Sequence, residues 1–206
     1  MSSSRHQPFL IVVSSPSGAG KTSVCRAVRK RVPNLAYSVS ATTRPRRRGE
    51  THGRSYFFCS EQEFGRRIKR GEMLEHARVY GHFYGTPRVP LFRQFQKGRD
   101  VIADLDIQGM RACKKSLPGT VGVFLTAPSR EELVRRLRAR GTDAPEGVAW
   151  RQAELAAELA AIPEFDYLVV NDRLERAVKD VMAILRAERL RTSRMMPSPS
   201  PGGLDR

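Results

Sequence analysis

The feature that most constrains this fold is the octapeptide Ser-Pro-Ser-Gly-Ala-Gly-Lys-Thr at residues 15–22, directly after an apolar run at 9–13. The apolar run predicts a buried strand, and the segment 23–30, which lacks Gly and Pro, predicts a helix. A strand, a glycine-bearing loop and a helix in this order form a phosphate cradle, because loop N–H groups and the positive helix end face the same anion. The sequence therefore predicts an α/β core built around a phosphate-binding loop.

The cradle contains the side chains that nucleoside triphosphate chemistry needs. Gly18 and Gly20 let the backbone curl around an anion, Lys21 reaches the β- and γ-phosphates, and the Thr22 hydroxyl is a ligand for Mg²⁺. One departure from the motif G-x-x-x-x-G-K-[ST] is Ser15, which occupies the first glycine position. The predicted ATP-binding residues of the cradle are Ser15, Pro16, Ser17, Gly18, Ala19, Gly20, Lys21, Thr22 and Ser23.

Bulk composition predicts a cytoplasmic globular protein. The chain has 206 residues, of which 40% are hydrophobic and 28% charged, and its longest apolar runs are too short to cross a membrane or form a secretory leader. Three isolated cysteines favour a reducing compartment over a disulfide framework or a zinc site. We expect no membrane contact, and the sequence indicates no particular oligomeric state.

The net charge of +16, from 37 Lys and Arg against 21 Asp and Glu, points to anionic partners. Nucleotides and nucleic acid both fit such a charge, and a solvated arginine-rich surface explains it equally well. Since the rest of the sequence favours small nucleotides, nucleic acid is not the expected partner.

Apolar runs recur along the chain and alternate with helix-like segments, which predicts a parallel sheet covered by helices on both faces. Ligands of such sheets bind at the carboxyl ends of the strands, where the cradle lies. Further strands are predicted at 37–40, 101–105, 121–125 and 167–170, and helices at 23–31, 61–69, 89–96, 107–115, 130–138, 148–161 and 174–192.

Composition also divides the chain into lobes. Residues 41–87 are richer in aromatics and glycine and predict an inserted, partly β lobe, whereas 126–155 are arginine-rich and predict a mobile helical lid. The core is then expected at 9–40, 88–125 and 156–192, within a folded unit spanning 9–192. Segments 1–8 and 193–206 are expected to be flexible, the latter because it is rich in Pro, Ser and Gly.

Within the inserted lobe, four arginines lie between Arg44 and Arg48, after a strand and beside the hydroxyls of residues 40–43. This cluster fits a phosphate dianion, because arginine offers bidentate charged donors. Taken alone, it fits a solvated basic loop or a nucleic-acid patch equally well.

The cluster belongs to a longer series of motifs that resembles guanylate kinase of the bacterial type, a nucleoside monophosphate kinase. The resemblance covers about residues 9–189 and implies a P-loop NTPase three-layer core with a GMP-binding lobe and a lid. It also implies ATP-dependent phosphorylation of GMP to GDP, with Mg²⁺ as cofactor and ATP as co-substrate. The matching positions are Ser40, Thr42, Thr43, Arg44, Arg47, Gly49, Glu50, Gly53, Tyr56, Glu75, Tyr84, Gly85, Thr86, and the run from Asp104 through Asp106 to Gly109.

The resemblance implies that Glu75 accepts hydrogen bonds from guanine N1–H and the 2-amino group, while Ser40 and Thr86 contact the O6 edge. Adenine lacks both donors and would leave a buried Glu75 unpaired, so the carboxylate selects guanine. The remaining implied GMP-binding residues are Arg44, Arg47, Tyr56 and Tyr84 around the phosphate, together with Gly85 and Asp106. Arg46 stands where the family has Pro, so either Arg46 or Arg47 makes the second arginine contact.

For the donor side, the resemblance implies that Asp104 assists Thr22 at Mg²⁺, partly through water. The catalytic residues implied are Lys21, Arg136, Arg140 and Arg151, and Asn171 corresponds to the loop at the adenine end. A simpler reading of Asp104 and Asp106 is that one of them caps the helix that starts near residue 107.

Three alternatives remain at this point. A non-catalytic binding module on the same fold would have a degraded cradle, whereas Lys21 and Thr22 are present. A kinase for another phosphorylated acceptor would not need Glu75 together with Ser40 and Thr86. An additional role in RNA binding is suggested only by the net charge, and salt dependence of RNA affinity would test it.

Overall fold

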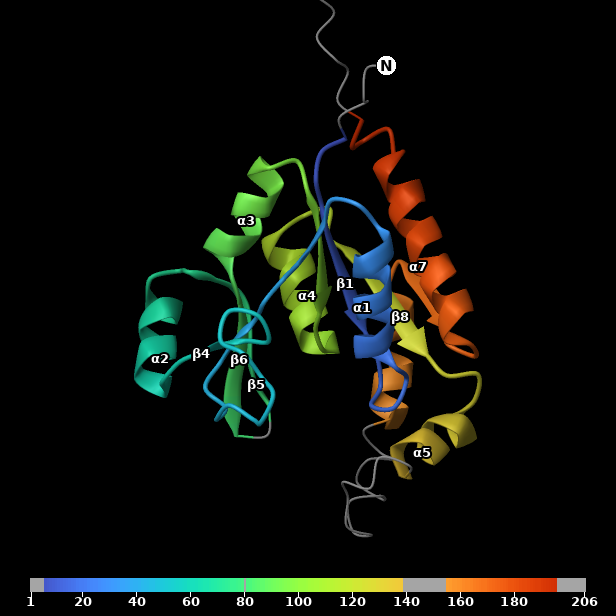
Figure 1. The fold of residues 1–206 in the computed structure, drawn as a ribbon, viewed down its shortest axis with the longest axis horizontal. Coiled ribbons are helices and arrows are strands. Elements are labelled where there is room, and N and C mark those ends of the chain that lie inside the picture. The colour runs from blue at the N-terminus through green and yellow to red at the C-terminus, as the bar shows by residue number, and fades with distance from the viewer. Residues whose placement is uncertain (1–5, 80, 139–154, 196–206) are drawn as a thin grey trace, which may run out of the picture.

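The computed structural model describes residues 6–79, 81–138 and 155–195, and its centre is a parallel five-stranded sheet (Figure 1). The central strand is β1, which lies between β7 and β8, and the full order is β2-β7-β1-β8-β9. All four pairings are parallel. The bounds are β1 Leu10–Ser14, β2 Leu35–Tyr37, β7 Asp100–Asp104, β8 Val121–Thr126 and β9 Tyr167–Val170.

Helices cover both faces of this sheet, as predicted (Figure 1). Successive residues of β1 point to opposite faces and are all buried, so Ile11 and Val13 pack with α1 (Lys21–Arg31) and α7 (Leu174–Arg189). Leu10 and Val12 pack on the other face with α3 (Arg88–Gln96) and α4 (Ile107–Ser116). A strand buried on both faces explains why the run at 9–13 is uninterruptedly apolar.

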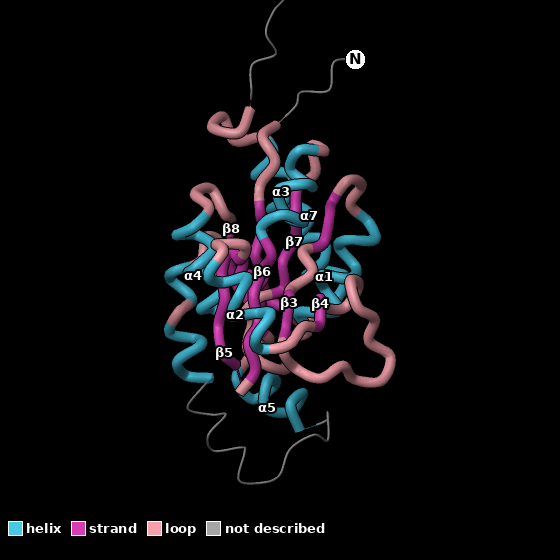
Figure 2. The backbone as a smooth tube through the Cα atoms, turned by 90° about the vertical axis from the view of Figure 1, so that its left-hand side faces the viewer, coloured by secondary structure: helices cyan, strands magenta, loops and turns pink. Residues whose placement is uncertain are grey.

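Residues 41–87 contain a second, four-stranded sheet with the order β4-β3-β6-β5 (Figure 2). Its core is small: Phe64 of the helix α2 (Glu61–Lys69) is fully buried and stacks on Phe83, and α4 packs against β5. The long β5–β6 hairpin is antiparallel. The bounds are β3 Ala41–Thr42, β4 Phe57–Phe58, β5 Met73–Val79 and β6 His82–Pro87.

Several predicted boundaries need correction. The strand predicted at 37–40 is β2 at Leu35–Tyr37. Ser38 N still donates to the Ile102 carbonyl of β7 at 2.9 Å, but the Ser40 carbonyl already accepts from Phe57 N of the second sheet at 2.9 Å. The helix α1 begins at Lys21, two residues early, and α7 ends at Arg189, three residues short of the prediction.

The predicted lid lies mostly outside the described residues. Within it, the structure describes residues 126–138, including α5 (Arg130–Arg138), and residue 155. Residue 155 belongs to a helical stretch that continues into the predicted core and is followed there by a 3₁₀ turn at Ile162–Glu164. The predicted flexible ends fall largely on residues 1–5 and 196–206, which are also outside the described part. No described helix has the length and apolar character that crossing a bilayer requires.

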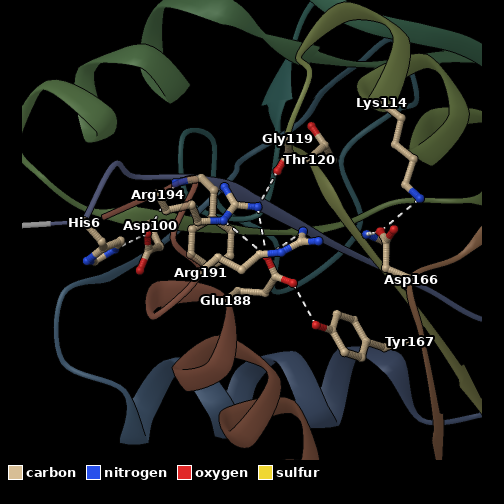
Figure 3. A network of polar contacts seen from close by, with 12 residues as sticks. His6, Asp100, Lys114, Gly119, Thr120, Asp166, Tyr167, Glu188, Arg191 and Arg194 are labelled. Carbon is tan, nitrogen blue, oxygen red and sulfur yellow. Dashed lines mark hydrogen bonds and ion pairs between the residues drawn. The ribbon is translucent and has the colours of Figure 1, made fainter. Parts of the chain in front are cut away.

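At the amino ends of the strands, buried carboxylates join segments far apart in sequence (Figure 3). Asp100, at the start of β7, accepts from Phe9 N at 3.3 Å and from Arg189 Nε at 2.7 Å. Glu188 of α7 accepts from Arg194 Nη2 at 2.9 Å, and the Arg194 guanidinium lies 4.2 Å from the centre of the Phe9 ring. This amino-end network fastens residues 190–195 to the beginning of β1.

Candidate active site

The cradle adopts the backbone that its sequence predicts. The chain leaves β1 at Ser14, and Gly18 and Gly20 have φ of 90° and 92°, the left-handed region that favours glycine. Asn34 is the one non-glycine residue with positive φ in the described part of the chain, so Ser15 is not left-handed. A serine therefore fits the first glycine position of the motif without backbone strain.

Lys21, Thr22 and Asp104 come together at the carboxyl ends of β1 and β7. Lys21 Nζ lies 2.8 Å from Asp104 Oδ1 and donates to the Leu105 carbonyl at 2.9 Å. The Thr22 hydroxyl donates to Asp104 Oδ2 at 3.3 Å. A hydroxyl beside a carboxylate suits Mg²⁺, which prefers oxygen ligands and completes its shell with water and substrate phosphates. The donor set thus fits the predicted metal.

A cavity of about 190 Å³ opens between the central sheet and the second sheet. Lys21 and Asp104 reach it from the cradle side, and Glu75 reaches it from β5 on the opposite side. Its predicted GMP-binding lining residues are Ser40, Tyr56, Glu75, Tyr84, Gly85 and Asp106. The structure therefore brings residues from both halves of the sequence to one cavity at the predicted end of the sheet.

Glu75 is the buried carboxylate of this cavity, with 6% of its surface exposed. Its Oε1 accepts from the Thr86 hydroxyl at 2.7 Å across the β5–β6 hairpin. Burial raises the pKa of Glu75 to about 7; the hydrogen bond from Thr86 opposes this shift, and the nearby charge of Asp106 adds to it. A carboxylate held in this way offers a strong acceptor for paired N–H donors.

The predicted phosphate clamp is organised around Arg44, which is buried while Arg46 and Arg47 are exposed. Arg44 Nη2 donates to Glu50 Oε1 at 2.6 Å, and Glu50 Oε2 accepts from Arg47 N at 2.8 Å. Glu50 thus bridges both ends of the arginine loop, and the pKa of this carboxyl is lowered by its hydrogen bond from Arg44. The sequence contained Glu50 within a motif but gave no signal for this bridging role.

Aromatic side chains support the clamp. The Arg44 guanidinium lies 5.5 Å from the centre of the Tyr56 ring, and the Tyr56 and Tyr84 rings are 6.0 Å apart in an edge-to-face arrangement. Three predicted phosphate ligands are therefore in mutual contact. The contact of Arg47 with the phosphate remains a prediction.

Asp106 and Arg136 have structural partners in addition to their predicted roles. Asp106 is the N-cap of α4, where its side chain accepts from Gly109 N at 2.7 Å, as the simpler reading of this residue anticipated. Arg136 of α5 donates to Glu132 at 2.7 Å and to the Asn171 carbonyl at 3.1 Å. The predicted lid residues Arg140 and Arg151 lie outside the described residues.

The parallel sheet, the glycine-bearing loop after β1 and the cavity facing it, lined by predicted ligands of an acceptor nucleotide, are typical of P-loop kinases that phosphorylate nucleoside monophosphates. A family model described as guanylate kinase matches residues 7–188. The chain therefore belongs to the guanylate kinase family.

Individual relatives agree over almost the whole chain. Guanylate kinase of Carboxydothermus hydrogenoformans is 48% identical over 190 residues, covering 92% of this chain and 93% of the relative. That of Escherichia coli K12 is 45% identical over 190 residues, covering 91% and 92%. A crystal structure of guanylate kinase from Anaplasma phagocytophilum superposes with a TM-score of 0.76 at 32% identity, covering 93% of this chain and 91% of that one.

Proposed function

We propose that this chain transfers the γ-phosphoryl group of ATP to GMP, producing ADP and GDP. Family membership supports this activity, and one observation ties it to the site. The buried Glu75 and the cradle lysine Lys21 line the same cavity from opposite sides. A guanine acceptor on one side and a triphosphate donor on the other are thereby directed toward each other.

On the acceptor side, Glu75 in its ionised form receives the guanine N1–H and 2-amino hydrogen bonds. Thr86 already donates to Glu75, which fixes the position of the carboxylate, and Ser40 adds to the polar lining. A base without these donors would leave the carboxylate buried and unpaired, which disfavours adenine.

The acceptor phosphate then binds at Arg44, Tyr56 and Tyr84, with Arg47 contributing from the loop. Arg44 either replaces its hydrogen bond to Glu50 by hydrogen bonds to phosphate oxygens or donates to both at once, since a guanidinium has five N–H donors. In the reaction an oxygen of the GMP phosphate forms a bond to the γ-phosphorus. The bond from the γ-phosphorus to the β–γ bridging oxygen breaks, and ADP leaves with that electron pair.

On the donor side, the cradle N–H groups and Lys21 hold the triphosphate. Lys21 gives up its ion pair with Asp104 and stays close to the negative charge of the γ-phosphoryl group as that group is transferred. Thr22 and Asp104 would hold Mg²⁺, partly through water, and when bound it neutralises charge on the donor phosphates. Arg136, together with Arg140 and Arg151 of the predicted lid, stabilises charge on the transferring group. Closure of the lid and of the GMP-binding lobe would exclude water, so that GMP and not solvent receives the group.

Small nucleotides are the proposed partners, and nucleic acid is not needed to account for the charge. Three free cysteines, two of them buried, are compatible with the reducing cytoplasm in which we propose that the protein acts.

The test is ADP formation from Mg-ATP with GMP, AMP, CMP and UMP supplied separately to the folded protein. We expect turnover with GMP and at least about 10³-fold lower kcat/KM with the other three. Equal turnover with AMP would contradict the role of Glu75. Folded protein that binds ATP but turns over none of them would contradict the proposed function itself.

A further inference from the structure

Asn171 is the residue at which the phosphate cradle, the end of the central sheet and α5 meet. It directly follows β9, and its backbone N–H donates to the Thr126 carbonyl at 2.7 Å, so its position is fixed by the end of β8. Its side chain is buried, with 6% of the residue exposed. The side-chain Nδ2 donates to the Ala19 carbonyl at 2.7 Å. This contact joins residues 152 positions apart.

The cradle is shaped to receive this amide. Gly20 has a φ of 92°, and a Cβ placed on it would lie 2.5 Å from Asn171 Nδ2, closer than any van der Waals contact allows. The absence of a side chain at position 20 therefore serves two purposes. It permits the left-handed backbone, and it leaves the volume that the Asn171 amide occupies.

Asn171 also contacts the first lid arginine. Its backbone carbonyl accepts from Arg136 Nη1 at 3.1 Å. Close by, Ala19 is fully buried in an apolar cluster with Leu133 of α5 and Leu155. The same residue thus binds the cradle through its side chain and α5 through its backbone.

We propose that Asn171 is a positioning residue, which sets the orientation of the Ala19–Gly20 peptide in the cradle. A trans peptide is planar, and its C=O and N–H groups point in opposite directions. Because Asn171 holds the Ala19 carbonyl, the Gly20 N–H is directed to the other side of the loop. On the proposed function, that side is where the donor phosphates bind. Arg136 donates to the backbone carbonyl of the same Asn171, so its position relative to the cradle is fixed as well.

This role differs from a contact with the adenine end of ATP, the position that the sequence resemblance implied for Asn171. If the Asn171 amide bound adenine, its removal should weaken the binding of ATP and have little effect on triphosphates with other bases. If the amide orients the cradle, its removal should weaken the binding of all of them equally, because every donor places its phosphates on the same N–H groups.

The test compares Asn171→Ala with the unchanged protein in calorimetric titrations with Mg-ATP, Mg-ITP and Mg-CTP in the absence of acceptor. The variant leaves the Ala19 carbonyl without its donor, so we expect affinity to fall about tenfold, by the same factor for all three. In turnover assays with GMP we expect kcat to fall as well, while GMP affinity is unchanged. Loss confined to ATP, or affinity that is unchanged for all three, would overturn the proposal.

Controls separate this result from a general loss of structure. Asp172→Ala alters the adjacent residue, whose carboxylate faces Arg176 and not the cradle, and should change none of these affinities. GMP binding reports folding, because Asn171 is not in the GMP cavity. If the alanine variant fails to bind GMP, Asn171→Ser makes the same comparison, since its shorter side chain cannot reach the Ala19 carbonyl. Because the titrations contain no acceptor, they decide the role of Asn171 even if phosphoryl transfer to GMP is not observed.

Discussion

Both ends of the central sheet pair basic side chains with carboxylates, yet the two sets of pairs differ in exposure. At the amino end, the Asp100 and Glu188 side chains are 1% and 2% exposed. At the carboxyl end, Asp104 lines the cavity and is 16% exposed beside Lys21, and in the lobe across the cavity Glu50 is 20% exposed beside Arg44.

This difference separates pairs that hold the fold from pairs that a substrate can replace. Glu188 is enclosed by protein donors, including the Tyr167 hydroxyl at 2.7 Å, and breaking its contacts leaves a buried charge. Lys21 and Asp104 line the cavity and are 21% and 16% exposed, so on the proposed function Lys21 can turn from the carboxylate to a phosphate. Ion pairs with similar distances are therefore expected to serve stability at one end and, on the proposed function, binding at the other.

The sharpest test at the carboxyl end is Lys21→Met. Methionine keeps much of the side-chain volume but has no charge to follow the transferring phosphoryl group. We expect kcat to fall about 10³-fold or more, in line with the loss of a group that stabilises transition-state charge. GMP affinity, measured by calorimetry, should stay within about twofold, because Lys21 serves the donor side. Near-normal turnover in this variant would show that the cradle is not catalytic.

The corresponding test at the amino end is Arg194→Met. It removes two hydrogen bonds to the buried Glu188, and we expect the free energy of unfolding to fall by about 3 kcal/mol in urea titrations. The matched control is Arg191→Met, whose guanidinium is largely exposed and lies 3.5 Å from the same carboxylate, and which should have a much smaller effect. KM for GMP should be unchanged in both. A large change in KM would mean that the two ends of the sheet are coupled.

The same contrast explains which features the sequence could predict. The cradle was predictable because its parts are contiguous: the apolar strand, the glycines and Lys21 follow one another within 9–22. The succession of parallel strands was predictable from alternation of apolar runs and helices. Asp100 and Glu188 gave no such signal, since their partners lie far away in sequence and Glu188 has the surroundings of an ordinary surface helix residue.

The cavity proposed to bind GMP is an intermediate case. Taken alone, the sequence around Glu75 is typical of a surface carboxylate, and only the resemblance to a known motif indicates guanine. What buries it is the antiparallel β5–β6 hairpin with the cap of α4 alongside, and the hairpin's register places Glu75 opposite Thr86. The role of Glu50 was missed for a related reason, because the path of the loop between Arg44 and Glu50 decides which atoms meet.

Within the cavity, Glu75→Gln tests whether the buried carboxylate selects the base. Glutamine keeps the shape but replaces one acceptor oxygen by a donor, so it can no longer accept both guanine hydrogen bonds. We expect KM for GMP to rise about 30- to 100-fold, equivalent to about 2–3 kcal/mol, with a smaller change in kcat. Thermal unfolding should show no loss of stability at pH 8, because the buried charge disappears. An unchanged KM would place guanine elsewhere.

The pH dependence of GMP binding should give the smallest effect and the most specific one. The pKa of Glu75 is raised on folding from 4.5 to about 7. The contribution of this carboxyl to the free energy of unfolding is therefore complete below pH 4.5 and is lost as the pH rises through 7. GMP needs the ionised form, and its affinity should therefore rise as stability falls. We expect KM to be about tenfold higher at pH 6 than at pH 8, because with a pKa of about 7 roughly a tenth of the carboxyl is ionised at pH 6 and roughly nine tenths at pH 8. The GMP phosphate also titrates near pH 6, and Glu75→Gln provides the correction, because that variant retains the phosphate titration and lacks the carboxyl. If both proteins show the same pH profile, Glu75 is already ionised at pH 6, and the cavity is more polar than its burial implies.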